Sequence, residues 1–325
     1  MAALFDMFAA EIVNGVIVAM VKGQIQGLMR TVFRTQALCW PSLDEARNIT
    51  STISIPLSLT EIRDLKSLRR FVSMAHEIHV LAHSCLDYYI QTSMVMSPSS
   101  LVQLPHNGSI QDRFDKAESR QYETHYTNAP SWIEEQQVMK ALWRIQLFFE
   151  LNIAQKMGIL NWSRDDLQTL ASINIRDFYT VKEFELQQIL TVYEFIQGFR
   201  REGYSQDDDC RLPIVPMENP FNTTCAPQPF YYSFREDIYQ QGQRYVHKPP
   251  MSWNFQGVMA RDPLFSPPPG IPFDPYRKFG FALWDDKRMT DLGLAKPSRR
   301  VILDKVSYYF RWRSVLTEEE RKWRP

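Results

Sequence analysis

The stretch EFELQQILTVYEFI, from Glu183 to Ile196, decides the fold class. Its apolar residues recur every three or four positions, which places them on one face of an α-helix. They are Leu186, Ile189, Leu190, Tyr193 and Ile196. Thr180 and Glu183 match a capping box at the start of this helix, and Gly203 offers the left-handed residue that commonly follows a helix. We therefore predict a helix that begins near Thr180 and ends before Gly203.

Two more helices are predicted immediately before this stretch. Ser131 and Glu134 form a second capping box, and the run that follows has apolar residues at helical spacing. These residues are Val138, Leu142, Ile145 and Phe149. Ser163 and Asp166 give a weaker start signal for a shorter helix between the two. The central part of the chain is therefore expected to be a helical core.

A long amphipathic segment is predicted to begin at Ser58, which can form a capping box with Glu61, and to extend to about Gln91. One face of the segment is apolar and consists of Leu68, Phe71, Ala75, Ile78, Ala82, Cys85 and Tyr89. This pattern fits one long helix or two. Closer to the N-terminus, residues 12–20 form a further apolar run, for which docking on the core is favoured over binding at a membrane interface.

The same N-terminal run is too short and too acidic at its start to be a membrane span or a signal peptide. Asp6 and Glu11 precede it where a signal peptide has basic residues, and Lys22 ends it well short of the ~20 apolar residues that cross a bilayer. The four cysteines are far apart and form no C-x-x-C pair, which favours reduced thiols. We expect a soluble protein of the cytoplasm or nucleus without a transmembrane segment.

The composition changes after the run Asp207 to Asp209. Of the 20 prolines, 13 lie between Pro213 and Pro275, a density that interrupts long regular elements. The same region is rich in aromatic residues, which a free linker has little reason to keep. We predict that residues 204–277 form an ordered coil that wraps the helical body and inserts aromatic anchors into it.

Regular structure is predicted to return in residues 278–325. Asp285 is a good N-cap for a short helix that Gly293 ends. Residues 301–312 fit a strand or a helix, and periodicity alone leaves both open. Thr317 and Glu320 match a capping box for a last helical turn.

Together these segments predict a mainly α fold: an irregular multi-helix domain with a Pro/aromatic-rich coil as its wrapping segment. We expect one domain over residues 1–325. It comprises an N-terminal helix and connection in residues 1–57, a helical core in 58–203, the wrapping coil in 204–277 and a C-terminal segment in 278–325. A chain of this length and 44% hydrophobic residues is large enough to bury a substantial core.

The charge balance and the missing motifs limit the function. Lysine plus arginine and aspartate plus glutamate both number 37, so no excess of positive charge favours nucleic acid. The chain has no G-x-S-x-G elbow, P-loop or G-x-G-x-x-G fingerprint, so we predict no cofactor and no catalytic residue. The expectation is a non-catalytic protein-binding or scaffold component with another protein as its partner, in an oligomeric state that stays open. An enzyme with a site assembled from distant segments is an alternative.

A second alternative is a divalent-metal protein built on the stretch AHEIHVLAH. His76, His79 and His83 lie within about 60° of arc on one side of the predicted helix. We interpret them as surface or boundary histidines, with a metal site and a pH-sensitive contact as the alternatives. His76 and His83 are separated by about 10 Å of helix rise, too far to share one ion easily. His79 and His83 can chelate as a pair, with further ligands that the sequence does not identify.

Three stretches carry a resemblance to other proteins. They are PLSLTEIRDLKSLRRFV from Pro56, EEQQVMKALWRIQLFFEL from Glu134 together with EFELQQILTVYEFI, and YRKFGFALWDDKRMTDLGL from Tyr276. In their order the chain resembles a group of uncharacterised proteins of filamentous fungi, some of which are described as F-box proteins. The resemblance implies a shared helical fold. It does not extend to the F-box itself, because an F-box opens on a Leu-Pro pair near the N-terminus and here the pairs lie at 104–105 and 212–213.

Overall fold

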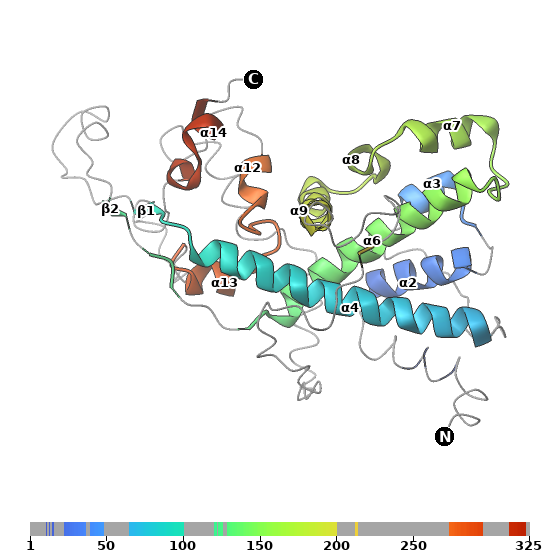
Figure 1. The fold of residues 1–325 in the computed structure, drawn as a ribbon, viewed down its shortest axis with the longest axis horizontal. Coiled ribbons are helices and arrows are strands. Elements are labelled where there is room, and N and C mark those ends of the chain that lie inside the picture. Colours follow the sequence, from blue (N-terminus) through green and yellow to red (C-terminus); the bar gives the residue numbers. More distant parts are fainter. Residues whose placement is uncertain are drawn as a thin grey trace. The chain divides into compact units, whose positions relative to one another are not determined.

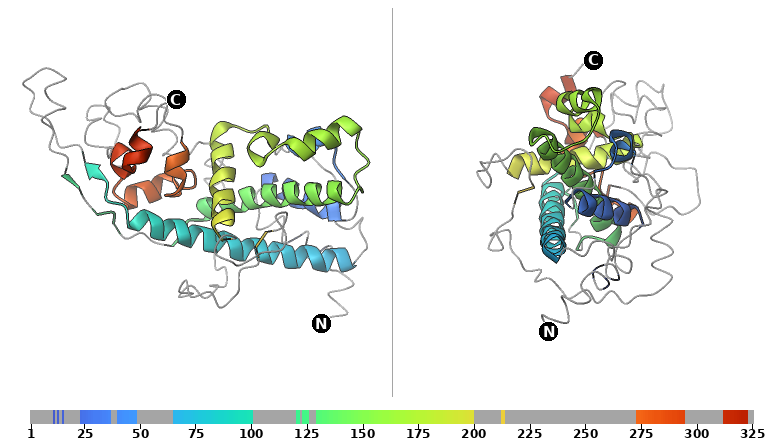
Figure 2. Two further views of the ribbon diagram at one scale, coloured as in Figure 1. Left: turned by 45° about the horizontal axis from the view of Figure 1, so that its top comes forward. Right: turned by 90° about the vertical axis from the view of Figure 1, so that its right-hand side faces the viewer.

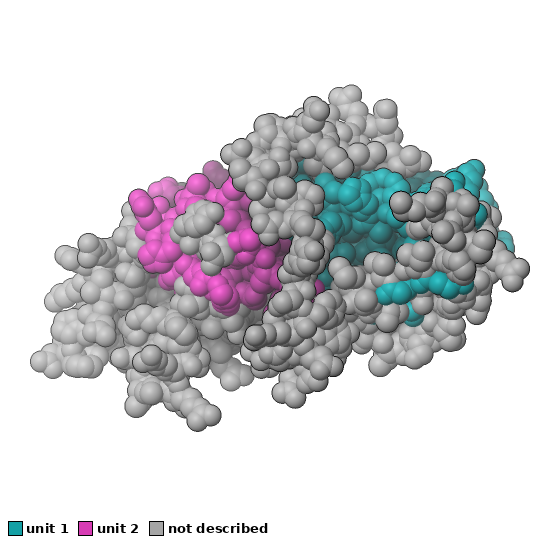
Figure 3. All heavy atoms as spheres, turned by 90° about the horizontal axis from the view of Figure 1, so that it is seen from below, with its two compact units in different colours: residues 1–85, 135–247 teal, residues 86–134, 248–325 magenta. Residues whose placement is uncertain are grey.

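The computed structural model describes residues 11, 13, 15, 23–36, 40–48, 65–100, 120–121, 123–125, 129–199, 212–213, 273–294 and 312–322. This part of the chain is mainly α-helical, as predicted. It forms two compact units, each made of two separate stretches of sequence (Figure 3). Unit 1 takes residues 1–85 and 135–247, and unit 2 takes 86–134 and 248–325. The prediction of one domain over the whole chain stays a prediction.

Unit 1 is a helical body (Figure 1). It contains α2 (Gly23–Gln36), α3 (Leu43–Arg47), most of α4 (Leu65–Met94), most of α6 (Trp132–Lys156), α7 (Arg164–Ser172), α8 (Ile175–Phe178) and α9 (Glu183–Phe199). Helix α4 is continuous over its 30 residues, so the part of the long amphipathic segment that the structure describes is one helix. Its predicted apolar face is buried at every position except the half-buried Ala75.

Aromatic contacts hold the helices of unit 1 together. The ring of Phe71 in α4 lies 5.0 Å from that of Phe33 in α2 and 5.7 Å from that of Trp143 in α6. On another side of α6, the rings of Phe148 and Phe178 are 5.1 Å apart. Large aromatic side chains contribute most to a core per residue, because each removes about 150–250 Å² from water. Helix α6 therefore lies at the centre of unit 1.

Side-chain caps fix where several helices begin. Ser131 and Glu134 form the predicted capping box: the Glu134 amide donates to Ser131 Oγ at 3.3 Å, and the Ser131 amide donates to Glu134 Oε2 at 2.9 Å. The Asp166 amide donates to Ser163 Oγ at 3.1 Å, also as predicted. Ser42 and Glu45 form a further capping box before α3, which was not among the predicted caps.

The start of α9 differs from its prediction. The first helical acceptor is the carbonyl of Lys182, which receives the amide of Leu186 at 3.0 Å. Thr180 instead donates its own amide to the carbonyl of Arg47 at 3.2 Å, which holds it outside the helix. The carboxylate of Glu183 accepts from Gln187 at 2.8 Å. The predicted Thr180 cap is therefore wrong by two residues, because a tertiary hydrogen bond competes with the local one.

Unit 2 takes the end of α4 and several short elements (Figure 2). These are β1 (Ser99–Ser100) and β2 (Arg120–Gln121), which pair antiparallel, α12 (Asp274–Arg277), α13 (Asp286–Asp291), the 3₁₀ helix η4 (Trp312–Val315) and α14 (Glu318–Lys322). The predicted caps are confirmed, because the Arg288 amide donates to Asp285 Oδ1 at 2.8 Å and the Glu320 amide to Thr317 Oγ1 at 3.3 Å. Gly293 follows α13 with φ 74°, as predicted.

A tight approach inside unit 2 needs a glycine. Gly280 has φ 70°, a region that favours glycine. A Cβ atom at this position would lie 2.7 Å from Trp284 Cζ2 and 2.8 Å from Tyr89 Cβ. The indole of Trp284 donates to the carbonyl of Phe279 at 2.8 Å, and Ser93 Oγ donates to the same carbonyl at 2.8 Å. The turn at Gly280 thus lets the buried indole reach its partner.

Other predictions fall mainly outside the described residues. Most of the wrapping coil, the Ser58 start signal, the left-handed stop at Gly203 and nearly all of the N-terminal apolar run belong to this group, as do residues 301–311. At the end of the coil region, Phe273 and Tyr276 are buried with 3% and 0% of their surface exposed, and α12 is helical. The wrapping coil itself stays a prediction.

Candidate metal centre

Helix α6 carries an unusual number of buried polar residues. All 17 residues from Glu135 to Leu151 are buried, and seven of them are polar or charged. They are Glu135, Gln136, Gln137, Lys140, Arg144, Gln146 and Glu150. A helix buried on all sides is normally apolar, because a buried charge is costly unless it is paired or coordinates a metal. These seven side chains are therefore candidates for a metal-binding or other ligand-binding site.

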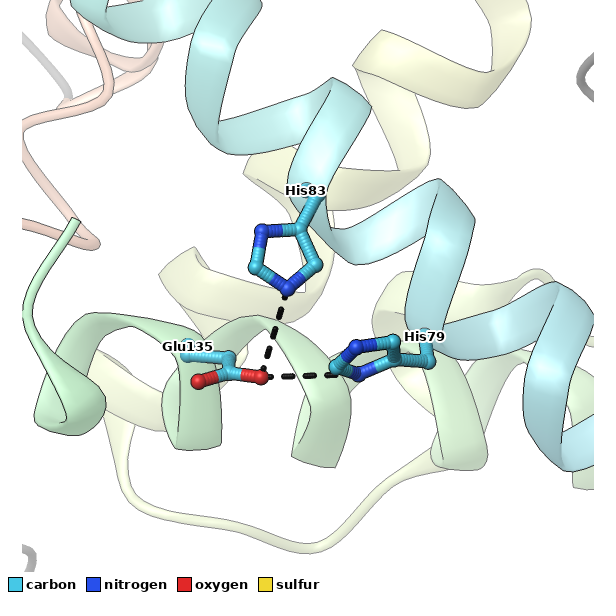
Figure 4. Close-up of side chains that lie close together, drawn as sticks. All are labelled: His79, His83 and Glu135. Atoms are coloured by element: carbon cyan, nitrogen blue, oxygen red, sulfur yellow. Dashed lines mark ion pairs between the residues drawn. The ribbon is translucent and has the colours of Figure 1, made fainter. Parts of the chain in front are cut away.

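Glu135 is the residue of α6 that meets the predicted histidine stripe (Figure 4). The capping box at Ser131 sets the start of α6 and places Glu135 in its first turns, where the helix dipole favours a carboxylate. His79 and His83 lie one turn apart on α4, and both rings point toward the Glu135 carboxylate. All three residues belong to unit 1.

Two of the distances within this cluster match those of a metal site. His79 Nδ1 lies 3.4 Å from Glu135 Oε1, and His83 Nε2 lies 3.5 Å from the same oxygen. The three ligand atoms lie within 4.8 Å of one another. Two ligands of one tetrahedral ion with bonds of about 2.0–2.1 Å are separated by about 3.4 Å. The cluster can therefore hold an ion with little movement of its side chains.

The electrostatics of the cluster keep His79 in the form that binds metal. Burial is the largest influence on the pKa of His79 and lowers it below 6.5, and repulsion from His83 lowers it further. Glu135 raises the pKa, but not enough to reverse the shift. His79 is therefore mostly neutral at pH 7, which is the form of imidazole that binds metal.

One side of the cluster is open to solvent. The side chain of His83 is 44% exposed and that of His79 is 25% exposed, whereas that of Glu135 is only 5% exposed. The carboxylate is buried and the two imidazoles lie toward the surface. A metal ion held by these three ligands would therefore have a fourth coordination position that water or another ligand can reach. Two histidines, one carboxylate and an open position form a known ligand set for Zn²⁺ and for Fe²⁺.

His76, the third residue of the predicted stripe, is exposed and does not belong to this group of ligand atoms within the described residues. The sequence did not predict Glu135 as a metal ligand. Its neighbour Glu134 carries the capping signal, and the helix that contains both residues was interpreted only as part of the core. The only local feature that marks Glu135 is that it is a second acidic residue directly after the capping glutamate. The sequence does not show that its carboxylate faces α4.

In the part of the chain that the structure describes, the other candidates from the sequence form no comparable cluster. The thiol of Cys85 is fully buried, and burial raises its pKa well above 9.0, so it is a poor nucleophile. Asp285 caps α13, which accounts for it structurally. The acidic run at 207–209 lies outside the described residues.

No protein-family model, no curated protein and no solved structure matches the chain. The resemblance to filamentous-fungal proteins therefore stays a prediction, as does the protein-binding or scaffold role. None of the helices in the described part of the chain is both long enough and apolar enough to span a bilayer.

Proposed function

We propose that this protein binds one divalent transition-metal cation, with zinc as the best match, through His79, His83 and Glu135. The observation that carries the proposal is that both imidazole nitrogens lie 3.4–3.5 Å from one buried carboxylate oxygen. Histidine and carboxylate ligands suit Zn²⁺, which takes four ligands at about 2.0–2.2 Å. The bound ion would join α4 to α6 within unit 1.

Protons compete with the ion for the same nitrogens. Protonated imidazoles can form ion pairs with Glu135, which would make the cluster a pH-sensitive contact instead. The lowered pKa of His79 favours the metal at neutral pH, because the proton is already lost there. The three protein ligands leave the fourth position to water or to a side chain of a protein partner. A non-catalytic metal-stabilised component of the cytoplasm or nucleus is the role we propose.

Metal titration of the untagged full-length protein tests this proposal. After dialysis against EDTA, the wild type is expected to bind one equivalent of Zn²⁺ by calorimetry. It should also give the intense visible absorption of a four-coordinate site with Co²⁺. The expected gain in unfolding free energy is about 2.7 kcal/mol at a free zinc concentration of 100 times Kd.

Three variants and one matched control locate the ion. His79→Ala, His83→Ala and Glu135→Gln are expected to lose the bound equivalent and the zinc-dependent gain in stability. His76→Ala is the control, because His76 lies on the same helix but is exposed and outside the cluster. An unchanged zinc stoichiometry in the Glu135→Gln and His79→Ala variants would overturn the proposal, as would a wild type that binds no zinc.

A further inference from the structure

A second cluster of buried charges lies in unit 1, between α6 and α9. Lys140 and Arg144 are one turn apart on α6, and Glu185 lies in the first turn of α9. Lys140 Nζ donates to Glu185 Oε1 at 3.0 Å, and Arg144 Nη2 donates to Glu185 Oε2 at 3.0 Å. The side chains of Lys140 and Arg144 are each 4% exposed, and that of Glu185 is 13% exposed.

This cluster has more positive than negative charge. An arginine guanidinium is always charged in proteins. Burial lowers the pKa of Lys140 to about 8, with Glu185 opposing and Arg144 adding to the shift, so Lys140 is largely charged at pH 7. Burial raises the pKa of Glu185, but attraction to Lys140 and Arg144 outweighs it and brings the pKa to about 2. Two cations thus face one carboxylate, which leaves a buried excess of one positive charge.

The guanidinium of Arg144 also has unused donors. Among the residues that the structure describes, no hydrogen-bond acceptor reaches its Nε or Nη1, and both atoms are buried. These two nitrogens carry three of the five N–H donors of the side chain. A buried charged donor without an acceptor is costly, so such a group in a native protein calls for an unseen partner.

The surroundings of Arg144 hold it in place. Its guanidinium carbon lies 5.9 Å from the ring centroid of Tyr179, and the Tyr179 hydroxyl donates to the carbonyl of Arg144. One nitrogen is fixed by Glu185 and one face is turned toward an aromatic ring. The N–H groups of Nε and Nη1 are the donors of this side chain that remain for a ligand.

We infer that Arg144 and Lys140 form a binding site for a small oxyanion, a carboxylate or a phosphate group. Such a ligand would neutralise the excess charge and accept a hydrogen bond from the unused N–H donors of Nε or of Nη1. Oxygen anions suit this site because their lone pairs match the planar donors of a guanidinium, and hydrogen bonds between charged partners are the strong ones. The site is separate from the histidine cluster and does not rest on the metal.

Thermal unfolding of the full-length protein tests this inference. Inorganic phosphate and acetate are each titrated in Tris buffer with EDTA, against sodium chloride of equal ionic strength. At least one of the two is expected to raise Tm saturably, by about 3 °C at ten times its Kd. A phosphate response identifies a phosphate ligand, and an acetate response identifies a carboxylate ligand. If neither anion acts beyond the chloride reference, the inference is wrong.

Variants assign the response to the site. Arg144→Gln is expected to abolish it, and Arg144→Lys, which keeps the charge but loses the guanidinium donors, is expected to weaken it. Arg70→Gln is the matched control, because the side chain of Arg70 is also in unit 1 but 65% exposed. A His79→Ala, His83→Ala double variant should keep the full response. Retention of the response in both Arg144 variants would overturn the assignment, and the wild-type titration remains decisive even if a variant fails to fold.

Discussion

Two arginines, Arg144 in unit 1 and Arg288 in unit 2, are both buried, and their charges are compensated in different ways. The side chain of each is 4% exposed, and each faces a glutamate. Arg288 donates from Nε to Glu134 Oε1 at 3.1 Å and from Nη2 to Glu134 Oε2 at 2.8 Å. Arg144 reaches its glutamate with one nitrogen and shares that glutamate with Lys140.

The partners of Arg288 form a closed network. Its Nη2 also donates to the carbonyl of Ala129 at 3.0 Å, and its guanidinium carbon lies 5.5 Å from the ring of Trp284. Glu134 accepts further from the amide of Ser131, which completes the capping box of α6. The guanidinium here meets both oxygens of Glu134, and the nearby carboxylate of Asp285 adds a second negative charge. The comparison teaches that a buried arginine bound to both oxygens of its own carboxylate is a structural tie, whereas one that shares its carboxylate with a lysine keeps donors for a ligand.

The largest expected effect comes from breaking the pair of Arg288 and Glu134. Arg288→Met should lower the free energy of unfolding by about 3–5 kcal/mol, because it leaves Glu134 buried without its cation. Urea unfolding followed by circular dichroism measures the loss. Lys287→Met is the control, since the neighbouring Lys287 is 67% exposed and should cost about 0.5 kcal/mol or less. Similar small losses in both variants would show that Glu134 and Arg288 are not a structural tie.

A second, somewhat smaller effect is the acid sensitivity of unit 1. The pKa of Glu185 is about 2 in the folded protein against an ordinary value of 4.5, so the unfolded state takes up the proton first as the pH falls. The stability that Glu185 contributes is therefore complete above pH 4.5 and is lost progressively toward pH 2. By linkage the loss is about 3 kcal/mol.

Urea unfolding of the wild type and of Glu185→Gln across this pH range measures that contribution. The variant should be less stable than the wild type at pH 7, and the difference should shrink by about 3 kcal/mol between pH 4.5 and pH 2. A difference that stays constant with pH would mean that Lys140 and Arg144 do not hold the carboxylate charged.

The sequence could predict local features of both regions. Helix spacing and capping boxes depend on residues three or four positions apart, so Ser131 with Glu134 and Thr317 with Glu320 were found from their letters alone. The exception at Thr180 is informative, because its amide is taken by Arg47, 133 positions away. A capping pattern in the sequence therefore predicts the start of a helix unless a distant group binds one of the atoms that the cap would use.

The chemistry of the sites depends on such distant groups. Lys140 and Glu185 are 45 positions apart, and Glu134 and Arg288 are 154 apart. A helix period shows which residues share a face but not what that face meets, so Glu135 could not be assigned to the histidines. The periodicity of α6 also predicted only that its apolar face is buried. The structure shows that its polar residues are buried too.

The smallest expected effect is the sharpest test of the comparison. Arg144→Met should change the free energy of unfolding by about 1 kcal/mol or less in phosphate-free buffer, far below the effect of Arg288→Met. Removing Arg144 leaves Lys140 and Glu185 as a one-to-one pair and relieves the desolvation of an incompletely bonded guanidinium, while methionine keeps most of the apolar packing. Lys140→Met should be similarly mild, because Arg144 and Glu185 then balance. Urea unfolding of both variants beside Glu185→Gln gives the pattern: two small losses for the cations and a large one for the carboxylate they share. A loss of 3 kcal/mol or more, on the scale of a broken buried pair, for Arg144→Met would contradict it, since Arg144 would then be as fully engaged in the fold as Arg288.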